Sequence, residues 1–288
     1  MDGGLKDVGV IIDGDEPLAD SVLAGVALRL SHHYGACIRV FAQGRDHRGA
    51  QLNFWADDLE LPAYAGVEIC GIPDQPVSRR RALRSPLSEL RREARNDLYR
   101  TERVETQDLL EALGCTDLII AGSPLTSEPA GRPDTEDIVA HSGRPVLIVP
   151  RKFAQRRSAE LKIGYHILIA WNASAPASRA VHDAMPFLRR AEETTLLYVD
   201  DAHDRARARH LVSAIVDHLA RHQVEVRAHV MTAADASPAH AILDRIDELG
   251  VNLLVMGAFS RSRLREIWFG GASEELLHQV GVPILTCH

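Results

Sequence analysis

A loop between two apolar runs near the end of the chain carries the residue pattern most capable of chemistry. The run 253–256 stops at Gly257, and a polar loop that contains several arginines follows. Gly270 and Gly271 then open a segment with helical periodicity, which leads into a second apolar run after Pro283. This order is typical of a strand, a loop, a helix and a strand. Backbone N–H groups at such a helix N-terminus lack intrahelical partners, so the stretch predicts an anion-binding site.

The same residues also have a purely structural interpretation. The glycines are ordinary turn residues that would shape a strand-to-helix connection. Arg261, Arg263 and Arg265 can supply positive charge to a polyphosphate. Alternating loop arginines are more often solvated or paired with nearby acids, here Glu266. Both interpretations stay open at the level of the sequence.

Composition and charge are those of an average globular protein. The 288 residues suffice for two domains, each able to bury its own core. The apolar share of 45% and the charged share of 25% are ordinary. A formal net charge of −7 argues against a dedicated nucleic-acid binder.

The cysteines and the apolar runs predict a cytoplasmic protein. The first ten residues lack a positively charged stretch followed by an apolar one, so we expect no signal peptide. We also expect no membrane span, because no apolar run approaches ~18 residues. Cys37, Cys70, Cys115 and Cys287 show no CxxC spacing. This pattern favours buried free thiols in a reducing compartment over disulfides or a metal site.

The chain repeats a pattern of apolar runs, which predicts two α/β domains. The paired runs are GVIIDGD with ILIAWNAS, DLIIAG with NLLVMG, and GRPVLIVP with GVPILTCH. Apolar strands that alternate with amphipathic helices form parallel sheets covered on both faces, because parallel strands need helical crossovers. We therefore expect a first doubly wound domain at 1–150, a charged linker at 151–162 and a second at 163–288.

The spacing of the repeats shows where the two copies differ. Asp13 corresponds to Asn172 at an offset of 159, and Gly122 corresponds to Gly257 at an offset of 135. The first copy therefore carries 24 extra residues, mainly the segment 44–66. Its glycine loop is shorter and contains three prolines, which remove N–H donors: Pro124, Pro129 and Pro133. The sequence predicts that the first copy has lost any phosphate site.

These features resemble the universal stress protein family. The resemblance lies in the order of the runs, the DG ending of the first strand, the G-x-P-[IV]-L ending and a loop similar to G-x2-G-x9-G-[ST]. It covers nearly the whole chain as a tandem pair. It implies two domains, each a five-stranded, mostly parallel sheet flanked by helices, similar to the adenine nucleotide alpha-hydrolase fold. Some members bind ATP at the carboxyl ends of the strands, where open α/β sheets bind ligands.

The second domain keeps part of the family's ATP-binding pattern. Gly257 and Gly270 match the first and third loop glycines, whereas Ser260 replaces the middle glycine and Gly271 the final Ser or Thr. Asn172 stands where binding members have an acid that contacts adenine, and its amide retains an acceptor. The resemblance implies an ATP site, with Mg²⁺ accompanying ATP as the only metal. Its residues would be Ala170, Asn172, Val199, Met256, Gly257, Ser260, Arg261, Arg263, Gly270, Gly271 and Ala272. The first domain keeps Asp13 but lacks the loop.

Two charged segments are interpreted as solvated helix faces. His210, His218 and His222 lie on a predicted helix at 205–222, and a metal site would need further ligands. The segment 79–103 holds nine arginines against four acids on a predicted amphipathic helix. Its alternative role is to bind an acidic partner.

The sequence contains no signature of an enzyme. GxSxG, GxxxxGK[ST] and GxGxxG after the first strand are all missing, and ATP hydrolysis would lack an obvious general base. We therefore expect a non-catalytic stress-response module with an adenine-nucleotide site in its second domain. The alternatives are a nucleotide-free interaction or scaffold protein of the same fold and, less favoured, an enzyme of unknown type.

The apolar terminal strand at 282–287 predicts pairing, because an exposed strand edge invites another strand. In the family this strand often mediates dimers, so we expect the two domains to form an intramolecular pseudo-dimer. Whether two chains also form a homodimer is left open by the sequence.

Overall fold

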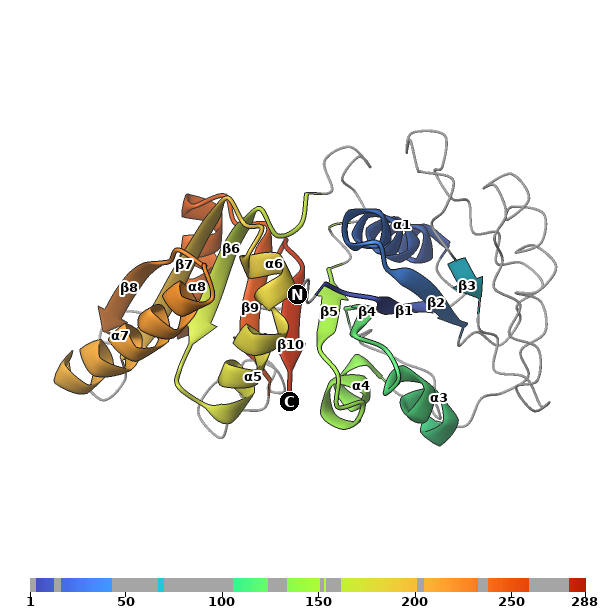
Figure 1. The fold of residues 1–288 in the computed structure, drawn as a ribbon, viewed down its shortest axis with the longest axis horizontal. Coiled ribbons are helices and arrows are strands. Elements are labelled where there is room, and N and C mark those ends of the chain that lie inside the picture. Colours follow the sequence, from blue (N-terminus) through green and yellow to red (C-terminus); the bar gives the residue numbers. More distant parts are fainter. Residues whose placement is uncertain are drawn as a thin grey trace. The chain divides into compact units, whose positions relative to one another are not determined.

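The structure is a computed structural model that divides into two compact units, Met1–Leu161 and Lys162–His288 (Figure 1). It describes residues 4–12, 17–42, 67–69, 106–123, 134–150, 153, 162–200, 205–232, 238–258 and 280–288. The predicted insertion at 44–66, the arginine-rich helix at 79–103 and nearly all of the predicted linker lie outside these residues.

The second unit is a five-stranded parallel sheet. Its strands are β6 (His166–Trp171), β7 (Glu193–Asp200), β8 (Arg227–Thr232), β9 (Leu253–Gly257) and β10 (Ile284–Cys287). They lie in the order β10-β9-β6-β7-β8, and every neighbouring pair is parallel. All five residues of β9 and all four of β10 are buried, as a strand covered on both faces requires.

Four helices of the second unit lie in the described residues: α5 (Ala175–Asp183), α6 (Met185–Leu188), α7 (Arg205–Arg221) and α8 (Pro238–Glu248). Helix α5 packs against β9 and β10, α7 packs against β7 and β8, and α8 packs against β7 (Figure 1). The apolar residues of α5 explain its position, because Ala177, Ala180 and Val181 lie on one side of the helix and are all buried.

The first unit has the same architecture. Its strands are β1 (Asp7–Ile12), β2 (Cys37–Ala42), β3 (Val67–Ile69), β4 (Leu118–Gly122) and β5 (Val146–Val149), in the order β3-β2-β1-β4-β5. Its described helices are α1 (Pro17–Tyr34), α3 (Thr106–Leu113) and α4 (Thr135–His141). All the strand pairs are parallel. The predicted fold class, two doubly wound α/β sheets, is confirmed.

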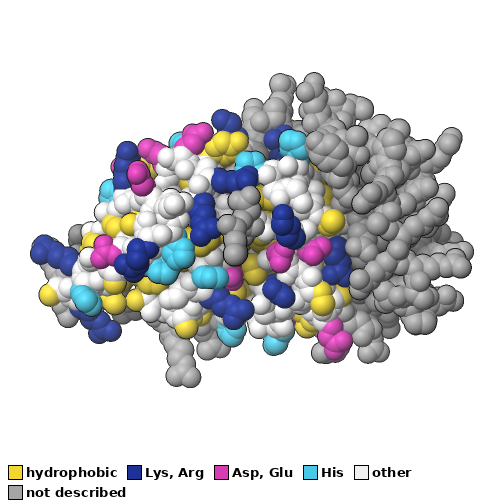
Figure 2. Space-filling view, in the orientation of Figure 1, with side chains coloured by type: hydrophobic (Ala, Val, Ile, Leu, Met, Phe, Trp, Pro, Cys, Tyr) yellow, Lys and Arg dark blue, Asp and Glu magenta, His cyan; other side chains and the backbone are white. Residues whose placement is uncertain are grey.

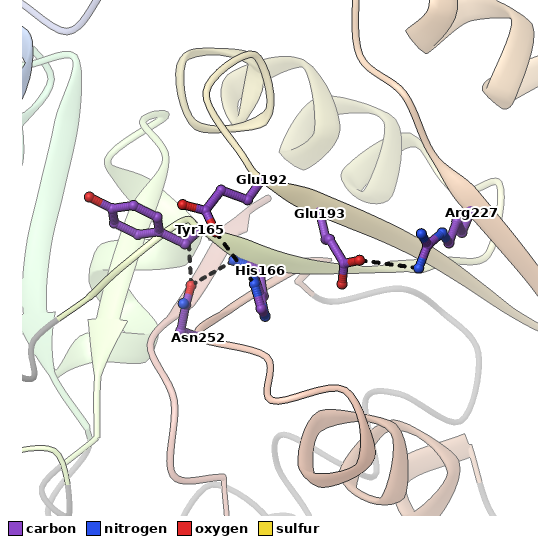
Figure 3. A network of polar contacts seen from close by, with 6 residues as sticks. All are labelled: Tyr165, His166, Glu192, Glu193, Arg227 and Asn252. Atoms are coloured by element: carbon purple, nitrogen blue, oxygen red, sulfur yellow. Dashed lines mark hydrogen bonds and ion pairs between the residues drawn. The ribbon is translucent and has the colours of Figure 1, made fainter.

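The same side-chain clamp fixes the amino end of the first strand in each unit. In the second unit, Asn252 Oδ1 accepts hydrogen bonds from the N–H groups of Tyr165 at 2.9 Å and His166 at 3.1 Å (Figure 3). In the first unit, Asp117 Oδ2 accepts them from Lys6 at 2.7 Å and Asp7 at 3.0 Å. Tyr165 follows Lys6 by 159 residues and Asn252 follows Asp117 by 135, the two offsets of the sequence repeat.

The polar network around Asn252 lies at the amino edge of the sheet. Two exposed ion pairs flank it: His166 Nε2 with Glu192 Oε2 at 3.8 Å, and Arg227 with Glu193 at 3.1 Å (Figure 3). Exposed pairs of this kind contribute only about 0–1 kcal/mol each to folding stability. The network therefore holds the strand ends in register.

The described cysteines are free thiols, but they are not all buried. Cys287 is buried, whereas Cys37 and Cys115 are exposed, and Cys70 lies outside the described residues. The prediction of burial is wrong for Cys37 and Cys115 because each lies at an element boundary: Cys37 begins β2, and Cys115 lies in the turn between α3 and β4. Within the described ranges, no helix is long and apolar enough to cross a bilayer.

Candidate functional site

The carboxyl edge of the second sheet is where its topology favours a ligand. Strands β6 and β9 are neighbours, but the chain leaves β6 toward β7 and reaches β9 only after β8. Adjacent strand ends whose connections run in opposite directions leave a crevice outside the sheet, where ligands of α/β proteins bind. This switch point is the candidate site.

The structure brings the described part of the predicted site together at this edge. Ala170 of β6 lies in register with Met256 of β9, and Gly257 follows as the last residue of β9. Val199 is in the last two residues of β7, the other neighbour of β6, and Asn172 directly follows β6. The remaining predicted residues lie outside the described part of the chain: Ser260, Arg261, Arg263, Gly270, Gly271 and Ala272.

Asn172 orders the turn that leads from β6 into α5. Its Oδ1 accepts a hydrogen bond from the N–H of Ser174 at 3.1 Å. The hydroxyl oxygen of Ser174 in turn accepts one from the N–H of Ala177 at 3.2 Å, which caps α5. Between them, Ala173 has a φ of 56°, a left-handed conformation that costs a non-glycine residue about 1 kcal/mol. Asn172 therefore has a structural role that needs no ligand.

Gly257 is required by close packing against the start of α5. A Cβ at this position would lie 2.6 Å from the carbonyl carbon of Pro176, 2.8 Å from Cα of Ala177 and closer still to the nitrogen of Ala177. These are backbone atoms, which cannot rotate away. The equivalent Gly122 has room, because its nearest heavy atom would be Leu23 Cδ1 at 3.9 Å. The structural interpretation of Gly257 is thus sufficient by itself, and its role in an anion site stays a prediction.

Within the residues that the structure describes, two buried polar atoms at the carboxyl edge lack hydrogen-bond partners. Trp171, the last residue of β6, is 8% exposed, and its indole Nε1 is buried with no partner. Thr286, next to last in β10, is fully buried, and its Oγ1 also has none. Thr286 lies in register with Met256, which lies in register with Ala170, so these three share one face of the sheet.

Such orphaned groups are uncommon and costly. An unsatisfied buried donor or acceptor costs about 1–3 kcal/mol, and each one in a folded protein calls for an explanation such as an absent water or ligand. Sequence reasoning did not select Trp171. The available signal was an aromatic residue with a polar N–H at the end of an otherwise aliphatic strand, directly before Asn172.

The buried thiol near this edge is not a nucleophile at neutral pH. Burial, and after it the nearby Asp183 carboxylate, raise the pKa of Cys287 to about 11. Asp183 lies at the end of α5, and Arg179 Nε is 3.9 Å from its Oδ2. A thiol with so high a pKa stays protonated, and only the thiolate attacks an electrophile. Cys287 therefore belongs to the packing between α5 and β10.

The corresponding edge of the first unit is occupied by the chain's own groups. The side chain of Asp134 accepts a hydrogen bond from the N–H of Asp137 at 2.7 Å and caps α4. The hydroxyl of Thr135 donates to the carbonyl oxygen of Gly122, the last residue of β4, at 2.9 Å. Glu136 adds a further carboxylate to the first turn of α4. This acidic helix start would repel a phosphate, and the loss of a phosphate site in the first copy stays a prediction, because residues 124–133 lie outside the described part of the chain.

Comparison with known proteins identifies the second unit. Residues 165–288 match the model of the universal stress protein family. A universal stress protein from Archaeoglobus fulgidus DSM 4304 has the same fold, with a TM-score of 0.60 and 16% identity over 98% of this chain and 97% of that chain. A functionally unknown protein from Pseudomonas aeruginosa PAO1 has a TM-score of 0.53 and 14% identity over 98% of this chain and 92% of that chain. The chain matches no curated protein sequence.

Proposed function

We propose that this protein, whose second unit is a universal stress protein domain, is a non-catalytic stress-response protein that binds ATP at the carboxyl edge of that unit. The observation that carries the proposal is the orphaned indole Nε1 of Trp171, the last residue of β6, directly at the switch point. A polar ligand at the switch point would supply the partner that this nitrogen lacks within the described residues.

The residues present fit an adenine base. Ala170 is half-buried and Met256 is 4% exposed, so the two form an apolar surface from adjacent strands against which a base can pack. The Asn172 side chain at the rim offers an amide, which can both donate to and accept from the edge of a base. Bound ATP would supply the negative charge of its phosphates and the Mg²⁺ that accompanies them. The protein's contribution in this proposal is to bind and orient the nucleotide.

The first experiment is to measure the nucleotide content and ATP affinity of the purified full chain. A denatured sample is examined by chromatography for released ATP or AMP, and ATP-Mg is titrated into the stripped protein by calorimetry. A dissociation constant in the micromolar range, about −8 kcal/mol, supports the proposal. An empty protein that shows no binding at millimolar ATP refutes it.

Asn172 provides the substitution that tests the location of the site. We expect Asn172→Ala to weaken ATP binding by about 3- to 10-fold, the effect of losing one net hydrogen bond of about 0.5–1.5 kcal/mol. Asn172→Asp keeps an oxygen acceptor for both the Ser174 N–H and the base, so it should retain the turn and most of the ATP affinity.

A matched control exists at the other edge of the same sheet. Asn252→Ala removes the acceptor of two backbone N–H groups, so it should destabilise the domain while ATP affinity stays unchanged. If Asn172→Ala and Asn252→Ala lower ATP affinity equally, the effect is one of stability, and the proposed location is wrong.

The second candidate function is a nucleotide-free interaction protein of the same fold. It is favoured by the roles of Asn172 and Gly257, both of which the turn and the α5 packing explain without a ligand. Trp171 Nε1 would then be satisfied by water, and a high-resolution crystal structure of the nucleotide-free protein would show that water ordered on the indole nitrogen.

We also propose that the first unit is a second domain of the same family that has lost nucleotide binding. The support is the repeated clamp of Asp117 and the acidic start of α4. The expected stoichiometry is one ATP per chain. Two ATP molecules per chain would contradict this assignment, and the calorimetric titration measures the number directly.

A further inference from the structure

Five basic or titratable side chains from three helices gather on the surface of the second unit, and neither the fold nor the nucleotide site uses them. We call them the histidine cluster: His182 of α5, Arg189 at the end of α6, His218 and Arg221 of α7, and His222 directly after α7. The guanidinium Nη2 of Arg189 lies 3.4 Å from Nδ1 of His222. The rings of His218 and His222 meet edge to face, with centroids 4.7 Å apart and an interplanar angle of 60°.

The described histidines of α7 and the turn after it lie on the solvated face that the helix pattern predicted, with His210 exposed and His218 and His222 partly covered. His218 and His222 are half-buried because they pack on each other and Arg189 closes over His222. The other three members are exposed, and the side chain of His182 is 78% exposed. Figure 2 shows histidine and basic side chains close together on this part of the surface. In the described residues, no group of three or more potential ligands is arranged to hold a metal ion.

Positive charge dominates the surroundings. Burial lowers the pKa of His218, and the neighbouring His222, Arg221 and His182 lower it further. Two acids lie close by. Asp183 of α5 is 3.6 Å from His182 and is also near Arg179, at 3.9 Å, while Asp217 of α7 is exposed beside His218. Arg190 adds another exposed cation next to Arg189. The cluster therefore gains charge as the pH falls, against mutual repulsion.

We propose that the histidine cluster is a docking surface for an acidic segment of a partner protein, and that docking tightens as the pH falls from about 8 to about 6. This proposal does not depend on nucleotide binding. Protonation of His218 is opposed by the positive charge of its neighbours, and a ligand that brings several carboxylates offsets that repulsion. The protein as a whole carries a formal net charge of −7, so this cluster is a local exception to its charge.

Three observations favour an acidic protein segment over other anions. The charges come from three helices and are mostly exposed, so a single small anion would gain little from any one of them. Several contacts at once are needed, as a chain of carboxylates provides. Nucleic acid is disfavoured because the net charge is negative and none of the five members is a Phe, Tyr or Trp that could stack on bases.

The direction of the pH effect follows from linkage. In the free protein, burial and, after it, the neighbouring His222, Arg221 and His182 hold the pKa of His218 below its ordinary value, so the ring is largely neutral near pH 7. Carboxylates placed against it raise that pKa, so binding takes up protons and becomes stronger as the pH falls. One coupled histidine gives up to about tenfold per pH unit across the interval between its free and bound pKa values.

The test measures the affinity of the full chain for a fluorescent oligoglutamate peptide by anisotropy, at about pH 6 and about pH 8. We expect binding at least about tenfold tighter at the lower pH. The double variant H218Q/H222Q should lose most of this difference. H210Q is the matched control, because His210 is an exposed histidine of α7 outside the cluster, and it should keep the full difference. An oligoglutamine peptide should not bind.

Equal affinity at both pH values, or an equal loss in H210Q, overturns the proposal. Displacement of the peptide by submillimolar inorganic phosphate, or tighter binding of an RNA oligonucleotide, also overturns it in favour of another anion. If the double variant does not fold, histidine NMR titrations of the wild-type chain decide the question. The peptide must raise the pKa of His218 or His222 and leave that of His210 unchanged.

Discussion

Gly257→Ala should destabilise the second unit severely, before any question of ligand binding arises. The new Cβ would lie 2.6 Å from the carbonyl carbon of Pro176 and 2.8 Å from Cα of Ala177, whereas ordinary van der Waals contacts begin at 3.4 Å. The start of α5 would have to move by about 1 Å. Overpacking of this kind costs about 1–3 kcal/mol. We expect the upper end, because the contacts are with backbone.

The shift would also disturb the cap of α5. The Ser174 hydroxyl accepts from the N–H of Ala177, the residue that the new methyl group would displace. A net loss of about 3 kcal/mol corresponds to a decrease in melting temperature of about 10 °C for a domain of this size. Differential scanning calorimetry and urea unfolding of the full chain measure this loss, with the transition of the second unit followed separately where the two units unfold in two steps.

Gly281→Ala is the matched control for this experiment. A Cβ at Gly281 would meet none of the described atoms within 4 Å, so we expect a change of less than about 1 kcal/mol, with a small gain from the reduced entropy of the unfolded chain. If Gly257→Ala melts within about 2 °C of Gly281→Ala, the close approach of α5 to β9 is wrong. The same result would make Gly257 available as a probe of ATP binding, a use that the predicted clash now rules out.

Three further predictions concern single residues of the second unit. Ser174→Ala removes the cap of α5 and should cost about 0.5–2 kcal/mol by urea unfolding, while Ser174→Thr should restore most of it. Trp171→Phe should weaken ATP binding several-fold. It should lower the free energy of unfolding by less than about 2 kcal/mol, because removal of an unsatisfied donor offsets the lost packing. A larger loss of stability would show that the indole N–H has a hydrogen-bond partner. The Cys287 thiol should resist a thiol-specific reagent in the folded protein until the pH nears about 11, and rapid labelling near pH 8 would contradict its burial. The contribution of the protonated thiol to folding stability should be complete below pH 9.0, the pKa of the unperturbed thiol. It should be lost as the pH rises from 9.0 to about 11.

The fold was predictable because its signals are local and repeated. Apolar runs such as 167–171 and 253–256 are too short for buried helices and recur at matching positions, so parallel strands are the consistent interpretation. The offsets of 159 and 135 that relate the runs also relate the Asn252 and Asp117 clamps in space. A clamp of this kind is not visible in one sequence, because it joins residues about 90–110 positions apart.

The roles within the site were harder to predict, since they depend on distances between elements. The sequence alone assigns Gly257 equally well to a phosphate-binding loop and to a tight connection between elements. Only the close approach of α5 to β9 explains why no side chain fits at position 257. The sequence alone does not single out Trp171, because an aromatic residue on a buried strand is normally core, and its orphaned nitrogen is a property of the packed structure. Cys37 and Cys115 were assigned to the core from neighbouring apolar residues, although each lies at a boundary where the chain turns outward.

The two carboxyl edges differ in a way that bears on function. In the first unit, the Asp134 carboxylate accepts from the N–H of Asp137 at the start of α4, and the Thr135 hydroxyl donates to the carbonyl oxygen of Gly122 at the end of β4. In the second unit, the ends of β6 and β10 keep two buried polar atoms without partners in the described residues. Keeping both groups unsatisfied would cost about 2–6 kcal/mol, a large share of the 5–15 kcal/mol that stabilises a typical protein. A polar occupant of the second edge would remove the part of that cost that belongs to Trp171 Nε1, and the carboxylates at the first edge would repel a phosphate, so the proposal expects a single nucleotide per chain.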